Sequence, residues 1–121
     1  MAYDDNNIFA KILRGEIPCD KIYEDDHVLA FKDINPQAPV HVLVIPKGAY
    51  ETMADFGSNA SEAEIVAFYR AVSKISEDLG VAENGFRAIS NVGSDGCQEV
   101  PHFHMHILAG AKIGPLVSKT A

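Results

Sequence analysis

Three histidines alternate with apolar residues near the C-terminal end, in the segment His102–Leu108, which reads HFHMHIL. Successive side chains of a β-strand point to opposite faces, so His102, His104 and His106 are expected on one face and the apolar residues on the other. Imidazoles titrate near neutral pH and can act as nucleophiles, acids and bases. The pattern therefore predicts a half-buried strand that carries a chemical site.

A metal site is one use of such a row, because imidazole is a common zinc ligand. Strand residues four apart are separated by roughly 13 Å, whereas zinc ligands converge to about 2.0–2.1 Å from one ion. A metal site made of two of the three histidines and a carboxylate such as Asp95 or Glu99 remains an alternative. The interpretation that these histidines simply lie on a solvent-facing sheet surface is less favoured, since three of the five histidines in the chain fall within five positions.

Nucleophilic and acid–base catalysis fits the row better. His104 has a histidine on either side and is the candidate nucleophile, while His106 or His102 can move protons. A neutral imidazole that attacks phosphorus gives a labile phosphohistidine-type intermediate, which suits phosphoryl or nucleotidyl transfer. Gln98 and the backbone N–H groups of residues 96–98 are expected to stabilise charge on the phosphate oxygens.

The rest of the chain predicts alternating strands and two helices around these histidines. Capping and periodicity signals favour a short helix and a long one, and apolar runs between turn residues favour five strands. The expected ranges are helices 8–14 (N-cap Asn7, stop Gly15) and 61–79 (capping box Ser61/Glu64, stop Gly80), and strands 21–24, 28–32, 40–46, 86–91 and 102–108. Together they predict an α+β domain, an antiparallel sheet of about five strands covered by the long helix.

Composition limits the function. The chain has 121 residues, 47% hydrophobic composition and a net charge of −7 without a basic run, which predicts one domain over 1–121 that does not bind nucleic acid. No apolar stretch approaches roughly 20 residues and the start is acidic, so we expect a cytoplasmic protein with no membrane span. Cys19 and Cys97 are far apart and are expected to be free thiols. An unpaired sheet edge would favour a symmetric dimer.

The segment His102–Leu108 fits the signature of the histidine triad (HIT) superfamily, in which three histidines alternate with apolar residues. The chain resembles the histidine triad nucleotide-binding (Hint) branch from about residue 8 to 110, with 111–121 as a tail. Further matching stretches are Ile8-Phe9, Ile12, 16–18, Ala30-Phe31, Asp33-Ile34, 36–39, His41, 43–47, Asn91, 93–96 and Gln98. The resemblance implies a homodimer with a ten-stranded sheet. It also implies metal-free hydrolysis of purine nucleoside phosphoramidates and related adenylates to the nucleoside monophosphate.

The resemblance also implies roles for single residues. His104 would attack the α-phosphorus, His106 would contact the phosphate and leaving group, and His102 and His41 would support them. His41 could alternatively be a satisfied core histidine, and Asp33 a turn residue instead of a ribose ligand. The resemblance implies an apolar slot for the base, although its residues could equally belong to the core: Ile8, Phe9, Ile12, Phe31 and Ile34. It implies polar contacts on the phosphate side for Asn91 and Gln98, which could equally cap loops.

Two positions depart from the family pattern. Glu99 stands where many Hint proteins carry serine, and an ionised carboxylate there repels phosphate unless it points away or meets a cationic amine. Cys97 stands where a glycine is usual, and its Cβ restricts the loop. Glu99 is thus kept as a nucleotide-site residue of altered role. These departures leave open a second function, a nucleotide-binding or protein-interaction module in which hydrolysis is incidental.

Overall fold

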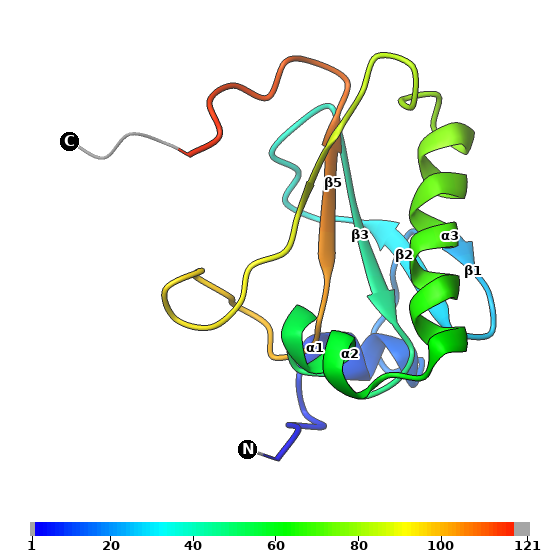
Figure 1. Cartoon of the computed structure of the whole chain (residues 1–121), viewed down its shortest axis with the longest axis vertical. Helices are drawn as coiled ribbons and strands as arrows, with labels where there is room; N and C mark the ends of the chain where they lie inside the picture. Colours follow the sequence, from blue (N-terminus) through cyan, green and yellow to red (C-terminus); the bar gives the residue numbers. More distant parts are fainter. Residues whose placement is uncertain (1, 118–121) are drawn as a thin grey trace.

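The computed structural model describes residues 2–117, which form one five-stranded antiparallel sheet and three helices (Figure 1). The strand order is β1-β2-β3-β5-β4, so β3 and β5 are central and β1 and β4 form the edges. This confirms the predicted α+β fold. The elements are α1 (Ile8–Leu13), β1 (Lys21–Glu24), β2 (Val28–Lys32), β3 (Val40–Pro46), α2 (Met53–Asn59), α3 (Glu62–Asp78), β4 (Arg87–Ile89) and β5 (Met105–Ala109). Met1 and residues 118–121 of the expected domain lie outside the described residues.

Both faces of the sheet are covered. Figure 1 shows α3 running along one side of the sheet, where Phe68 and Ile75 of the helix pack with Phe103 and Ile107. On the other face Phe9 of α1 packs with an apolar set from β2 and β3, which comprises Leu29, Phe31, Leu43 and Ile45. A strand covered on both faces is apolar along its whole length, which explains the run in β3.

The helix boundaries follow their capping residues. The Asn7 side chain accepts a hydrogen bond from the Ala10 N–H at the start of α1, and Ser61 and Glu64 form the predicted capping box of α3. None of the helices in the described part of the chain is long and apolar enough to cross a membrane.

The prediction of two helices was wrong, because α2 is a third. Its seven residues include Gly57 and Ser58, which lower helix propensity, and this weak local signal was not recognised. The helix is held by tertiary packing instead, since Phe56 is buried against the rings of Tyr50 and Phe103.

The histidine strand is shorter than predicted. β5 begins at Met105, whereas His102, Phe103 and His104 precede it, and the 86–91 strand is likewise reduced to β4. The ladder between β3 and β5 ends at the pair Val44 and Met105. Pro46, near that end of β3, has no N–H to continue it. Phe103 N–H donates to the Tyr50 carbonyl instead, 2.7 Å away.

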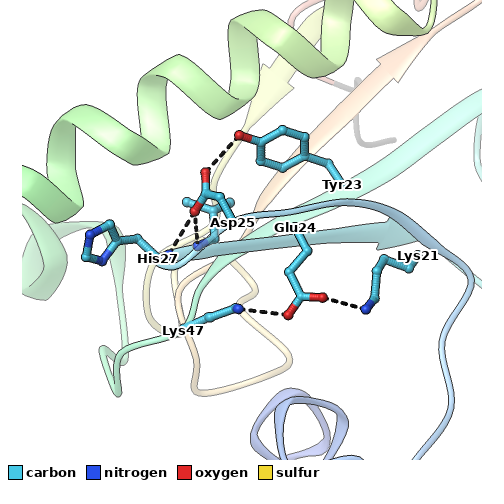
Figure 2. A network of polar contacts seen from close by, with 7 residues as sticks. Lys21, Tyr23, Glu24, Asp25, His27 and Lys47 are labelled. Carbon is cyan, nitrogen blue, oxygen red and sulfur yellow. Dashed lines mark hydrogen bonds and ion pairs between the residues drawn. The ribbon is translucent and has the colours of Figure 1, made fainter.

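The turn between β1 and β2 is closed by polar contacts among the residues labelled in Figure 2. One Asp25 oxygen accepts from the N–H groups of His27 and Val28, and the other accepts from the Tyr23 hydroxyl at 2.8 Å. Glu24 pairs with Lys21 and with Lys47 (Figure 2). These contacts set the register of the hairpin and give Tyr23 a hydroxyl partner of its own.

Candidate active site

A cavity of about 720 Å³ lies on the α1 face of the sheet, between α1, β3 and the segment before β5. It brings together eleven of the thirteen residues expected at the site: Ile8, Phe9, Ile12, Phe31, Asp33, Ile34, His41, Asn91, Glu99, His104 and His106. His102 and Gln98 do not line it. Three segments far apart in the sequence therefore converge on one pocket.

His104 is held with one ring nitrogen free. Its Nδ1 lies 2.8 Å from the His102 carbonyl oxygen, which only accepts hydrogen bonds, so Nδ1 carries the proton. Burial lowers the pKa of His104, so the ring is neutral at pH 7. The lone pair consequently sits on Nε2, as nucleophilic attack requires.

A chain of hydrogen bonds gives His106 the tautomer opposite to that of His104. The Gln37 N–H donates to Nδ1 of His41 at 3.0 Å, so the His41 proton is on Nε2. That Nε2–H donates to Nδ1 of His106 at 2.9 Å. Burial lowers the pKa of His106 to about 4, and this neutral ring keeps its proton on Nε2. His104 thus carries a free lone pair and His106 a free N–H group.

His102 is fully buried and stands outside the cavity. Its Nε2 donates to the Pro46 carbonyl at 2.9 Å, and its contact with His104 is made through its main-chain oxygen, not its ring. Burial lowers the pKa of His102 to about 4. The expectation of imidazoles titrating near neutral pH was therefore wrong for His102 and His106, because desolvation favours the neutral form of each.

Asp33 is anchored at the end of β2. One carboxylate oxygen accepts from the Asn35 N–H at 2.8 Å, and the other lies 3.3 Å from Nε2 of His41. Oxygen and nitrogen atoms of Asp33, His41 and His106 lie within 4.8 Å of one another, close enough to hold a metal ion. This is not the metal set considered from the sequence, which paired triad histidines with Asp95 or Glu99. A metal there would compete with the hydrogen bond that orients His106.

The apolar residues form one wall of the cavity. Phe9 and Phe31 are buried edge to face with ring centroids 5.6 Å apart, and the Phe9 ring also lies 5.0 Å from that of His104. Ile8 and Ile34 are exposed at the rim, Ile34 by 87%. Phe9 and Phe31 therefore belong both to the core and to the cavity wall, whereas Ile34 has no core role.

Comparison with known proteins identifies the family of this chain. Residues 14–113 match the model of the HIT domain family. The chain belongs to the HIT domain family. It is 58% identical over 97% of its length to an uncharacterized 13.2 kDa HIT-like protein of Azospirillum brasilense, covering 96% of that protein. It is 44% identical to the purine nucleoside phosphoramidase of Escherichia coli, covering 94% and 95% of the two chains.

Solved structures place the fold in the same family. A HIT family hydrolase from Clostridium thermocellum superposes with a TM-score of 0.85 at 43% identity, covering 95% of this chain and 99% of that one. The relatives and neighbours together support hydrolase activity for this HIT domain.

The loop before the triad is held by Gln98, which takes the loop-capping role left open as its alternative. The Gln98 amide accepts from Gly93 N–H and donates to the carbonyls of Glu51 and Val100. The N–H groups of residues 96, 97 and 98 donate to carbonyls of the same loop. The expectation that these backbone groups face a phosphate was wrong, because the tight turn uses them internally.

Cys97 and Asn91 both line the cavity of this HIT domain. Cys97 lines the cavity with φ of 59°, and it is the single non-glycine residue of positive φ in the described segment. Asn91 also lines the cavity, and the hydrogen bonds of the described residues leave its carboxamide free to contact a ligand.

Several site residues were missed by sequence reasoning. Leu43 lines the cavity two residues after His41, and strand alternation could have revealed it. Gln37 lies in the matching stretch 36–39, but its contact with His41 had no signal because it uses a backbone N–H group. Tyr3 donates to His102 from 99 residues away, a pairing that no local pattern encodes. Further lining residues are Ile17, Pro18, Cys19, Lys32, Asn35, Ile89, Val100 and Leu108.

Proposed function

We propose that this HIT domain hydrolyses purine nucleoside 5′-phosphoramidates and acyl-adenylates to the nucleoside monophosphate through a nucleotidyl-histidine intermediate. The observation that carries the proposal is the pair of opposite tautomers, His104 with a lone pair on Nε2 and His106 with a proton on Nε2, in one cavity. The name of the Escherichia coli relative supports the choice of substrate.

In the first step Nε2 of His104 attacks the α-phosphorus, and the bond from phosphorus to the leaving nitrogen breaks. The departing electron pair stays with that nitrogen, which accepts a hydrogen bond from the Nε2–H of His106, takes a proton from water and leaves as an amine. The hydrogen bond from His104 Nδ1–H to the His102 carbonyl stabilises the positive charge that develops on the imidazole.

In the second step the hydroxide that remains from this water attacks the phosphorus. The bond between His104 and phosphorus breaks, the electron pair returns to Nε2, and the nucleoside monophosphate is released. Both histidines end in their starting state, as turnover requires.

We assign the remaining contacts by their place in the cavity. The base lies against Ile8, Phe9, Ile12, Phe31 and Ile34, the ribose hydroxyls meet Asp33, and the phosphate meets Asn91. His41 positions His106, and His102 positions His104 through its carbonyl group. Gln98 acts indirectly, by holding the loop from which Glu99 enters the cavity.

We propose that the reaction needs no metal or other cofactor, because the neutral imidazole is itself the nucleophile. The test is steady-state hydrolysis of an adenosine 5′-phosphoramidate with a fluorogenic amine, with and without a chelator. Wild type should be active in both conditions and His104→Asn inactive, while the control His27→Asn, outside the cavity, keeps wild-type rates. An inactive wild type contradicts the proposal, and loss of turnover with chelator favours a metal held by Asp33, His41 and His106.

A nucleotide-binding module is the second candidate, and the carboxylate of Glu99 in the cavity is the observation that favours it. Binding of adenosine monophosphate by His104→Asn, followed calorimetrically, separates the two. Retained binding without turnover in wild type supports the module, whereas turnover in wild type that is lost in the variant supports the enzyme.

We also propose a homodimer that joins two sheets into ten strands through the β4 edge. β4 has three residues and pairs on one side with β5, so its other side is free within the described chain. Light scattering at micromolar concentration should give about twice the chain mass of 13.1 kDa. A mass of one chain contradicts the dimer.

A further inference from the structure

The N-terminal segment reaches the buried side of the histidine triad. The Tyr3 hydroxyl lies 2.5 Å from Nδ1 of His102, and the two rings meet edge to face with centroids 5.7 Å apart. Tyr3 precedes the 14–113 stretch that matches the family model, and it does not line the nucleotide cavity. Its contact with the triad is therefore not part of the matched domain.

The direction of this hydrogen bond follows from the partners of His102. The Pro46 carbonyl only accepts, so Nε2 of His102 carries the proton and Nδ1 offers a lone pair. Tyr3 must then be the donor. Burial raises the pKa of the Tyr3 phenol, so the hydroxyl keeps its proton at neutral pH.

Asn7 fixes the Tyr3 hydroxyl from the other side. Its Nδ2 donates to the Tyr3 oxygen at 2.9 Å and to the Asp4 carbonyl at 2.7 Å, while its Oδ1 caps α1. The hydroxyl thus accepts from Asn7 and donates to His102. A continuous chain of hydrogen bonds runs from the start of α1 to His102, and through the His102 carbonyl to His104.

We propose that Tyr3 is a positioning residue of the hydrolase: together with the Pro46 carbonyl it locks His102 in the Nε2–H tautomer and so fixes the carbonyl that holds His104 for attack. This inference rests on the proposed function. Tyr3 touches neither the cavity nor the reacting atoms, so its contribution is expected in kcat and not in KM.

Removal of the hydroxyl alone isolates this role. Tyr3→Phe keeps the ring against His102 but leaves Nδ1 as a buried acceptor without a donor, an unfavourable state. The His102 ring then lowers its free energy by rotating or changing tautomer, and this displaces the main-chain carbonyl of His102. A purely space-filling Tyr3 would not change the tautomer, because phenylalanine fills the same volume.

The experiment compares wild type, Tyr3→Phe and the control Tyr23→Phe, whose hydroxyl bonds Asp25 away from the triad. Imidazole ¹⁵N NMR should report one Nε2–H tautomer for His102 in wild type and Tyr23→Phe, and a mixture in Tyr3→Phe. The kcat of Tyr3→Phe should fall about tenfold, which corresponds to about 1.4 kcal/mol. Its KM should change less than about twofold if binding is untouched.

Asn7→Asp provides a second variant, because the aspartate retains the capping oxygen of α1 but loses the donor to Tyr3. A smaller loss of kcat than in Tyr3→Phe is expected. An unchanged His102 tautomer and unchanged kcat in Tyr3→Phe overturn the inference. A wild type without hydrolysis instead refutes the proposed function, and the NMR comparison still decides whether Tyr3 sets the tautomer.

Discussion

Nε2 of His41 lies 2.9 Å from Nδ1 of His106, although the two residues are 65 positions apart. Pairing of Leu43 in β3 with His106 in β5 brings the two strands into register, and alternation along β3 puts His41 on the same face. Since the Gln37 N–H fixes the proton of His41 on Nε2, the proton of His106 is directed into the cavity. His41 thus orients the N–H group of His106 that faces the leaving nitrogen.

His41→Asn should slow the proton-dependent step more than the attack on phosphorus. We expect kcat on a phosphoramidate to fall about tenfold, or about 1.4 kcal/mol, because the N–H group of His106 is no longer held towards the leaving nitrogen. An acyl-adenylate, whose carboxylate leaves without a proton, should be affected much less. Steady-state kinetics on both substrates checks this, and equal losses on both would contradict the assignment of His41 to the leaving-group side.

Stability should fall as the pH is lowered from about 7 to 4. His102 has a folded pKa of about 4 against an ordinary value of 6.5, so the unfolded chain binds more protons across this interval. The stabilisation is complete above pH 6.5 and is lost as the pH falls towards 4, which for His102 amounts to about 3 kcal/mol. Urea unfolding of wild type across this range measures the slope.

The control for this pH dependence is His27→Gln, which removes a histidine from the β1–β2 turn (Figure 2). It should unfold with the wild-type slope between pH 7 and 4. A flat profile for wild type would show that burial of the triad histidines does not depress their pKa values.

Cys97→Gly should stabilise the fold. Cys97 has φ of 59°, a left-handed conformation that glycine adopts without the steric cost of Cβ. We expect a gain of about 1 kcal/mol in the free energy of unfolding. Ser94→Gly in the same loop, where φ is negative, should instead lower stability by roughly 0.5 kcal/mol. Chemical denaturation of both variants checks the opposite signs.

Glu99→Gln should change the preference for the leaving group. Glu99 lines the cavity with His104, and among the described residues no cation pairs with its carboxylate. A phosphoramidate whose amine carries an ammonium group should lose about fivefold in kcat/KM, equivalent to about 1 kcal/mol for a solvent-accessible ion pair. A neutral amine substrate should not lose activity.

Asp95→Asn is the matched control for Glu99→Gln, because it removes the same charge from the same loop outside the cavity. It should leave the ratio of kcat/KM for the two substrates unchanged. An equal response of both variants would show that the effect is one of net charge and not of Glu99 itself.

The sequence determined the sheet and much of the site. Alternation along 102–108 placed Phe103 and Ile107 in the core and His104 and His106 on the opposite face, and the apolar run of β3 defined the central strand. These features are local, because side-chain direction follows from backbone period alone. Capping residues likewise located α1 and α3 closely.

Tertiary structure alone decided how the histidines work. The tautomer of His104 depends on the carbonyl of His102, that of His106 on the Gln37 N–H, and that of His102 on the Pro46 carbonyl together with Tyr3. Helix α2 exists because Phe56 is packed, and β5 starts late because β3 ends in a proline. Hydrogen bonds and burial between residues distant in sequence leave no periodic signal, so the protonation state of this site emerges only when the chain is folded.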